Sequence, residues 1–589
     1  RRQVNSVGNS IVYDKDLYEW GDDDWVTPYF EDMIIYELHV GSFSGEGDGV
    51  SASPARFRDA IDAHIDDLVE LGINMVELMP VCEFAAERSW GYNPSFLFAI
   101  EEAYGGPDGL KYFVDHLHRR GIGVLIDVVY NHLGGTDLAG NLLDYDGEEI
   151  YFYPEGNGFR DTPWGPRPDY GRREVREYIR DNIRFWLEEY HVDGFRLDGT
   201  AFVNVNAEGW QLLKEIAEVT DTVSRKAIVI AEHLPNDPAV TRPLAVGGAG
   251  IDSQWNDALH DNLREAIHQA AFGDPNMASV AAGMNHFDLG TGTQVVNYIE
   301  SHDEAAVHGR ISVAADGNNP RSEYAIGRSK VALAIVVLSA GIPMLLQGQE
   351  LLESRNFGDA PEHRIRWSYA DTNDGFLGFS RELLALRSRL PSFRSDGQQN
   401  VYHVNDGANV LAWHRYTNDG HDAVIVVSLS NDDFTDYELG FPQGGVWYDV
   451  LNGSRDEFDG PGGSGRSTID AGGPGRHGLP HSATIRVPRM AVRVFTQSPP
   501  PSEETGGFLR GDCNGDGSMD LSDPVDGLAQ LFLGGGPPDC ESACDANADG
   551  NRDISDAVYS LSYLFLGGAP PPRPWPDCDV DPSCDRDCP

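Results

Sequence analysis

Short apolar runs and helix-period segments alternate along most of this chain, and that alternation restricts the folds open to it. From residue 33 to about 393 each apolar run precedes a segment of helical periodicity, the first helix being predicted to start at Pro54 after an N-cap at Ser53. The predicted strands are MIIYELHV (33–40), NMVELMPV (74–81), IGVLIDVVYN (122–131), GFRLD (194–198), IVIAEH (228–233), IDSQW (251–255), VVNYIESH (295–302) and IPMLLQGQE (342–350). Eight such units favour an α/β fold with a closed (β/α)8 barrel over an open doubly wound sheet, and no GxGxxG follows the first strand.

The rest of the sequence divides the chain further. After the barrel, short strands separated by Gly and Asn/Asp turns predict an antiparallel β domain, and QSPPPSEETGG then reads as a flexible linker. The predicted segments are 1–30 (remnant of an N-terminal β domain, or entry segment), 31–395 (barrel), 396–498 (β domain), 499–509 (Pro-rich linker) and 510–589 (repeats with a cysteine-rich tail).

The charge balance bears on possible partners. The chain has 44 Lys and Arg against 94 Asp and Glu, a formal net charge of −50. A field of this sign repels nucleic-acid phosphates and anionic lipid, and no apolar run is long enough to span a bilayer. We therefore expect neither nucleic acid nor membrane as a partner.

The number and spacing of the cysteines indicate the cellular location of the protein. Cys82 stands alone, whereas six others crowd the end of the chain: Cys513, Cys540, Cys544, Cys578, Cys584 and Cys588. Three disulfides, with 15 possible connectivities, fit a short loop-rich segment and predict an extracytoplasmic or secreted protein. Zinc is the alternative, although this segment has no CxxC pair and no histidine.

Ionisable residues stand at the carboxyl ends of four predicted strands, where a barrel has its active site. The third strand ends in DVVYNH, the fourth in GFRLD, the fifth in IAEH and the seventh in IESHDE. Arg196 and Asp198 point to the same side of their strand, and two buried charges are tolerated there only if they pair or face a wet cavity. An ionised carboxylate beside a protonated one is what retaining glycoside hydrolysis requires.

These four motifs, in this order, resemble the α-amylase family, glycoside hydrolase family 13, over residues 10–497. The resemblance implies Asp198 as nucleophile, Glu232 as general acid/base and Asp303 as transition-state stabiliser, with no cofactor for catalysis. It also implies that His132, Arg196 and His302 bind the sugar or orient the carboxylates, and SWGYNPSFLFA (89–99) is similar to the branching-enzyme and trehalohydrolase branch, in which Tyr92 stacks on the sugar. Asp127, early in its strand, is expected to be structural, and Asn131 is expected to hold no calcium.

The implied substrate is an α-1,4-glucan such as starch, glycogen or maltodextrin. Transfer of the 1,4-α-glucan branching type is the expected reaction. The alternatives are hydrolysis, of the amylase, debranching or maltooligosyltrehalose trehalohydrolase type, and an inactive glucan-binding protein.

The C-terminal segment contains a repeat at a spacing of 33 residues. Each copy places oxygen ligands at positions 1, 3, 5, 9 and 12 of an EF-hand-like loop: Asp512, Asn514, Asp516, Asp520 and Asp523, then Asp545, Asn547, Asp549, Asp553 and Asp556. Tandem loops of this kind, each followed by an apolar helix, resemble a dockerin module. We expect two calcium ions here, with either a protein partner for the module or a calcium-rigidified cap that has none.

Overall fold

The computed structural model describes residues 2–3, 10–45, 49–50, 54–134, 150–285, 290–462, 467–499, 507–515, 518–533, 540–548, 552–566, 568, 570–572 and 579–580. The chain forms two compact units, Arg1–Gln497 and Ser498–Pro589. None of the described helices is both long and apolar enough to cross a membrane.

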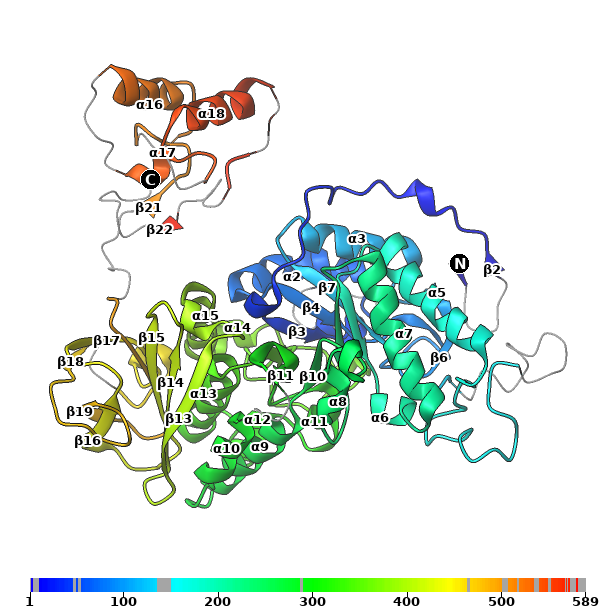
Figure 1. The fold of residues 1–589 in the computed structure, drawn as a ribbon, viewed down its shortest axis with the longest axis horizontal. Helices are drawn as coiled ribbons and strands as arrows, with labels where there is room; N and C mark the ends of the chain where they lie inside the picture. Colours follow the sequence, from blue (N-terminus) through cyan, green and yellow to red (C-terminus); the bar gives the residue numbers. More distant parts are fainter. Residues whose placement is uncertain are drawn as a thin grey trace. The chain divides into compact units, whose positions relative to one another are not determined.

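Eight parallel strands close into a barrel in the first unit, as the sequence predicts (Figure 1). In chain order they are β3 (Ile35–Leu38), β4 (Met75–Leu78), β7 (Gly123–Val128), β8 (Gly194–Leu197), β9 (Ile228–Ala231), β10 (Ser253–Trp255), β11 (Val295–Asn297) and β12 (Ile342–Leu346). The longer helices of the unit are α2 (Phe57–Leu71), α3 (Gly106–His118), α5 (Arg173–Glu189), α7 (Ala207–Val223), α9 (Asp257–Ala270), α13 (Glu323–Leu338) and α15 (Asp374–Arg389). The shorter elements of the unit are α1 (Val40–Phe43), α6 (Thr200–Val203), α8 (Pro238–Thr241), α10 (Met277–Met284), α11 (His302–Val307), α12 (Ile311–Ala315), α14 (Tyr369–Thr372) and the hairpin of β5 (Cys82–Phe84) with β6 (Pro94–Ile100).

The first helix starts later than the sequence predicts. Helix α2 begins at Phe57, not at Pro54, because the Asp59 carboxylate accepts the backbone N–H of Arg56 at 2.8 Å and fixes Arg56 as the N-cap. Ser53, the predicted N-cap, lies outside the described residues.

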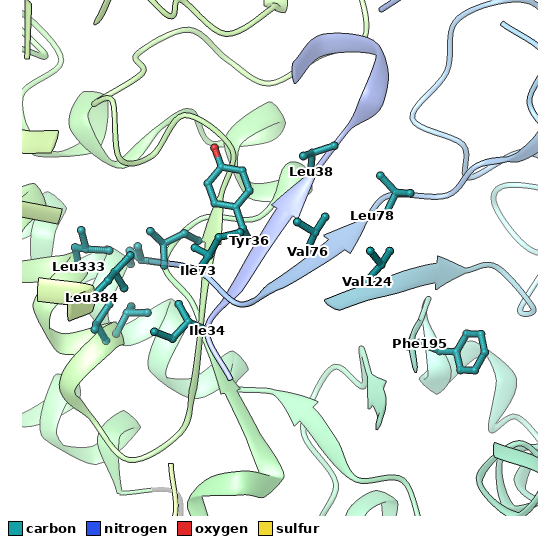
Figure 2. Close-up of a cluster of buried hydrophobic side chains, with 14 of the residues drawn as sticks. Ile34, Tyr36, Leu38, Ile73, Val76, Leu78, Val124, Phe195, Leu333 and Leu384 are labelled. Carbon is teal, nitrogen blue, oxygen red and sulfur yellow. The ribbon is translucent and has the colours of Figure 1, made fainter. Parts of the chain in front are cut away.

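Side chains alternate between the two faces of the barrel strands and build two cores. One face contributes to a large cluster that includes residues of the outer helices, and Figure 2 shows Tyr36, Val76 and Val124 of adjacent strands within it, together with Leu333 of α13. The other face turns inward, where Ile35, Met75, Leu125, Ile230 and Met344 belong to a second cluster. The inner layer closes one end of the barrel with apolar side chains and leaves the carboxyl ends of the strands for polar ones.

The segment before the barrel contains little regular structure in its described part. It contains the two-residue strands β1 (Arg2–Gln3) and β2 (Ser10–Ile11) and two 3-10 turns. Trp25 Nε1 and Thr27 Oγ1 donate to Asp193 at 2.8 and 2.6 Å, which fixes this segment to the turn that precedes β8.

The predicted antiparallel β domain is present after α15. Its six-stranded sheet runs in the order β13 (Gln398–Asn405), β14 (Val410–Tyr416), β15 (Asp422–Ser428), β20 (Val492–Thr496), β17 (Val446–Asn452) and β18 (Thr468–Asp470). A separate pair, β16 (Phe434–Phe441) and β19 (His481–Val487), shares with that sheet a core that includes Trp447 and Phe495.

The second unit contains the two repeats. Its described elements are β21 (Gly507–Phe508), α16 (Ser522–Phe532), α17 (Glu541–Cys544), α18 (Ile554–Leu566) and β22 (Asp579–Val580). The two longer helices, α16 and α18, each follow one of the predicted ligand loops. The two helices contact each other.

Candidate active site

A cavity of about 280 Å³ lies at the carboxyl ends of the barrel strands. Its lining combines carboxylates, imidazoles and aromatic rings: Trp90, Tyr92, Asn131, His132, Trp164, Asp198, Gly199, Phe202, Glu232, His302 and Asp303. All three predicted catalytic carboxylates are among these residues, and so are three of the four predicted sugar-binding residues. The fourth, Arg196, lies fully buried beside them.

Arg196 joins carboxylates from three adjacent strands. Its Nη1 lies 2.7 Å from Asp127 Oδ2 and 3.1 Å from Asp198 Oδ1, and its Nη2 lies 2.9 Å from Glu232 Oε2. Asp127 pairs directly with Arg196 in the register of β7 and β8. Asp127 is 2% exposed, and these contacts give it the structural position that its place in the strand predicts.

Asn131, which follows the third strand, holds Asp198 in place, and His132 contacts Asn131 in turn. The Asn131 side-chain amide donates to Asp198 Oδ2 at 2.5 Å and to the Asp198 carbonyl oxygen at 2.9 Å. Its own oxygen contacts His132 Nδ1, while His132 Nε2 lies 2.7 Å from the Tyr92 carbonyl oxygen. Burial lowers the pKa of His132, so its neutral form is favoured.

Glu232 is in a different electrostatic setting from the other carboxylates of the cavity. Its Oε2 accepts the backbone N–H of Gly199 at 2.7 Å. Burial raises the pKa of Glu232, and the charges of Asp198 and Asp303 add to that rise while Arg196 opposes it. The raised pKa shifts Glu232 toward the protonated form, which is the form that a general acid needs.

His302 is fixed from inside the barrel by Glu37. The Nδ1 atom of His302 lies 2.5 Å from Glu37 Oε1, and its backbone N–H donates to Glu37 Oε2 at 3.0 Å. On its other side, Nε2 lies 3.5 Å from Asp303 Oδ2. Burial lowers the pKa of His302, but the charges of Glu37 and Asp303 outweigh it and raise the pKa to about 9, so the imidazole is charged at neutral pH.

Tyr92 stacks on His302 at the edge of the cavity. Their ring centroids are 4.9 Å apart with an interplanar angle of 18°, and the Tyr92 hydroxyl donates to Asp127 Oδ2 at 2.5 Å. Trp90 packs edge-to-face against the same histidine, with its ring centroid 5.8 Å from that of His302. Together these rings form one wall of the cavity.

Several residues of the site carry no motif that the sequence analysis recognised. Glu37 and Glu77 are paired in the register of β3 and β4 and are both 1% exposed. Burial raises the pKa of Glu77 well above its ordinary value, with the charge of Glu37 adding to the rise. A carboxylate at an inward position of an apolar strand is the signal that could have identified them. Trp90 stands within the quoted segment SWGYNPSFLFA but was given no role, and Trp164, Gly199 and Phe202 of the lining were not predicted.

In the second unit, eight of the ten predicted calcium ligands are described, and Asp516 and Asp549 lie outside the described residues. Asp523 Oδ1 and Oδ2 accept the N–H groups of Asn514 and Asp520 at 3.2 and 2.7 Å. Asp556 repeats this pattern with Asn547 and Asp553 at 3.3 and 2.9 Å. Within the described ranges, no three His, Cys, Asp or Glu side chains form a group that could hold a metal ion.

The cysteines of this unit are oxidised where the structure describes them. Cys513 and Cys544 form a disulfide that links the two repeats, and Cys540 is also disulfide-bonded. Cys82 is a free, buried thiol in the barrel unit. Cys578, Cys584 and Cys588 lie outside the described residues.

The sequence matches two known domain families. Residues 59–139 and 165–375 match the α-amylase catalytic domain, and residues 402–498 match the α-amylase C-terminal all-β domain. The 1,4-α-glucan branching enzyme GlgB of Corynebacterium efficiens is 30% identical over 528 residues, which are 82% of this chain and 69% of that enzyme. The chain belongs to the α-amylase family.

A second relative and one solved structure are also similar to this chain. The 1,4-α-glucan branching enzyme GlgB of Leifsonia xyli subsp. xyli is 31% identical over 516 residues, covering 81% of this chain and 67% of the relative. The crystal structure of the α-amylase from Geobacillus thermoleovorans in complex with acarbose superposes with a TM-score of 0.63 at 17% identity, covering 80% of this chain and 99% of that one. At that identity the superposition shows a shared fold.

Replacing Glu37 with Gln tests the electrostatic role of this buried carboxylate. We expect the pKa of His302 to fall from about 9 to its ordinary value of 6.5 or below, because burial then favours the neutral ring while Gln can still accept a hydrogen bond. NMR titration of labelled histidine measures the shift. Glu70→Gln, at an exposed carboxylate paired with Arg381, is the matched control and should leave His302 unchanged. An unaltered pKa in Glu37→Gln would contradict this account.

Proposed function

We propose that this protein transfers segments of an α-1,4-glucan to a hydroxyl of a second glucan chain, which is a branching-type reaction with retention at the anomeric carbon. The observation that carries the proposal is the pairing of Asp198 and Glu232 on one buried guanidinium, where burial raises the pKa of Glu232. The similarity to two 1,4-α-glucan branching enzymes supports transfer as the outcome.

The first half of the reaction breaks the glycosidic bond. A carboxylate oxygen of Asp198 attacks the anomeric carbon, and Glu232 gives its proton to the glycosidic oxygen. The part of the glucan on the reducing-end side of the cleaved bond then departs with a new hydroxyl. The product is a glycosyl ester on Asp198 and an ionised Glu232. Arg196, which contacts both side chains, then remains as the counter-charge of the ionised Glu232.

The second half reverses the proton movement. Glu232 takes the proton of an acceptor hydroxyl, whose oxygen attacks the anomeric carbon and releases Asp198 as a carboxylate. In this proposal Asp303 stabilises the positive charge that develops on the sugar, and His302, His132 and Tyr92 bind or stack on it. A hydroxyl other than that of the chain end produces a branch, whereas water as acceptor would produce hydrolysis.

Incubation with amylose tests the proposed reaction. We expect few new reducing ends until an isoamylase digest releases short chains, because transfer conserves the number of reducing ends. Asp198→Asn should lower the rate by several orders of magnitude, since the nucleophile is lost. Reducing ends that rise at once would instead indicate hydrolysis, and wild-type protein that binds amylose without changing it would be an inactive binding protein.

We further propose that the second unit binds two calcium ions and that the protein is exported. The loops offer oxygen ligands, which calcium prefers. In each loop the carboxylate at position 12, Asp523 or Asp556, accepts the backbone N–H of the residue at position 9. The disulfide between Cys513 and Cys544 supports an oxidising, extracytoplasmic location. Between residues 511 and 589, 16 acidic residues face three arginines, so bound calcium would offset a strong local repulsion.

Calorimetry of the whole chain tests the calcium proposal. Two Ca²⁺ per chain should bind to the wild type and none to the double variant Asp523→Asn/Asp556→Asn, because both loops then lose their closing carboxylate. Asp526→Asn, a carboxylate outside the loops that bonds Gln530, should bind two as before. EDTA should leave glucan activity nearly unchanged. Absence of heat in the wild type would refute calcium binding, and loss of activity in EDTA would place a metal near the barrel site instead.

The dockerin-like module is proposed to pair with a partner protein domain. Its exposed apolar residues recur at the 33-residue spacing of the repeat: Leu521 and Ile554, Val525 and Val558, Phe532 and Phe565, and Leu533 and Leu566. Such a duplicated apolar surface is typical of a binding face.

Cross-linking tests this pairing. With calcium present, the chain is cross-linked to proteins of its own extracellular medium in parallel with Val525→Asp/Val558→Asp. We expect a defined adduct for the wild type that the variant loses, because two buried carboxylates would oppose docking. The same adducts for both proteins, or none for either, would favour a calcium-rigidified cap without a partner.

A further inference from the structure

A buried tryptophan lies against Arg196 from inside the barrel. Trp255 is the last residue of β10 and is 2% exposed. The Cζ atom of Arg196 lies 4.5 Å from the centroid of the Trp255 ring. The contact crosses the barrel interior, because β9 separates β10 from β8, the strand of Arg196. Trp255 is not among the described residues that line the cavity, and the steps proposed above give it no role.

Two further rings hold this tryptophan in place. Tyr298, just after β11, is 2% exposed, and its ring centroid lies 4.9 Å from that of Trp255. The ring of His260 on α9 stacks on Tyr298, with centroids 4.8 Å apart and an interplanar angle of 11°. His260 Nδ1 in turn lies 3.0 Å from Asp261 Oδ1. Trp255, Tyr298 and His260 thus form an aromatic column that leads from an outer helix to Arg196.

The bonds of Arg196 leave the tilt of its guanidinium in need of support. Its Nη atoms lie 3.1 Å from Asp198 and 2.9 Å from Glu232. Its Nε makes no hydrogen bond to any residue that the structure describes. Rotation about the last bonds of the side chain would therefore lengthen one of the two contacts while it shortens the other. An aromatic face attracts the cation through the ring quadrupole and restricts that rotation.

We propose that Trp255 is a positioning residue, whose ring holds the guanidinium of Arg196 where one cation can serve two carboxylates. Tyr298 braces Trp255 in that position. The inference rests on the proposed function, because the two carboxylates are the Asp198 and Glu232 to which that function assigns the bond changes. Trp255 itself acts on the reaction only through Arg196.

Loss of the ring should be visible in the pH dependence of the reaction. The charge of Arg196 opposes the rise that burial causes in the pKa of Glu232, so a guanidinium that tilts away lets this pKa rise further. Asp198 and Asp303 also face Glu232, and the substitution leaves both in place. A general acid acts in its protonated form, and activity falls as the pH rises through its pKa. The basic limb of the kcat/KM profile should therefore move to higher pH.

Trp255→Leu, assayed on amylose as branches plus reducing ends, tests this role. We expect kcat to fall about tenfold with KM nearly unchanged, because the guanidinium loses its support while the cavity lining stays the same. The basic limb should move to higher pH. Trp255→Phe, which keeps an aromatic face, should restore most of both. Trp447→Leu is the matched control: this fully buried tryptophan belongs to the core of the β domain, so its loss should destabilise the protein without moving the limb.

Tyr298→Leu gives a second measurement. We expect a smaller change in the same direction, and the double variant with Trp255→Leu should add little, because Tyr298 acts through Trp255. Fluorinated tryptophan covers the case in which Trp255→Leu does not fold, since it weakens the attraction of the ring for a cation and keeps the ring shape. Fluorination should slow the wild type more than Trp255→Phe, which has no tryptophan to label at this position.

The outcomes separate this role from the proposed function. A wild type that cleaves no amylose overturns both, whereas a wild type that only hydrolyses overturns branching and leaves the Trp255 comparison valid. A folded Trp255→Leu with the kcat and basic limb of the wild type overturns the positioning role alone. So does a fall in kcat with an unmoved limb, or one that Trp447→Leu shares, because either shows a general loss of packing. A lower kcat with a raised limb, both reversed by Trp255→Phe, supports the role.

Discussion

A buried guanidinium organises this active site. Arg196 has no exposed surface, and an unpaired charge at such a depth would cost several kcal/mol of desolvation. Its partners come from three neighbouring strands, with Asp127 on β7, Asp198 at the end of β8 and Glu232 at the end of β9. The same contacts that pair the buried arginine therefore set the positions of Asp198 and Glu232, the two carboxylates to which the proposed reaction assigns the bond changes.

The register of the barrel makes this arrangement possible. Inward positions carry apolar side chains at the first level, such as Ile35 and Met75, and ionisable ones two residues later, where Glu37 and Glu77 are neighbours in the register of β3 and β4. A register shift of one residue would turn each charge toward the outer helices and its apolar neighbour into the cavity. The catalytic layer thus depends on an alternation that also builds the hydrophobic core shown in Figure 2.

This dependence explains how much the sequence could predict. The eight strands and the positions of Asp198, Glu232 and Asp303 follow from local patterns, because a residue just past a strand end has a defined place in a barrel. Glu37 was not recognised, since its role depends on His302, which lies 265 residues later in the chain and meets Glu37 only when the barrel closes. Trp164 was missed for a related reason: it comes from a long loop whose path no periodicity specifies. The start of α2 was predicted at Pro54 from the preference of proline for the first helical turn. The helix starts at Phe57 instead, where the Asp59 side chain accepts the backbone N–H of Arg56.

One guanidinium serves two carboxylates of opposite task because their other neighbours differ. Asp198 also accepts a hydrogen bond from the Asn131 side-chain amide at 2.5 Å. Glu232 receives one backbone N–H, but burial and the nearby charges of Asp198 and Asp303 favour its protonated form. In the proposed reaction Asp198 loses its negative charge when it becomes an ester, so its contribution to the raised pKa of Glu232 disappears as the proton leaves. The charge lost at one carboxylate thus prepares the other to act as the base of the second half-reaction.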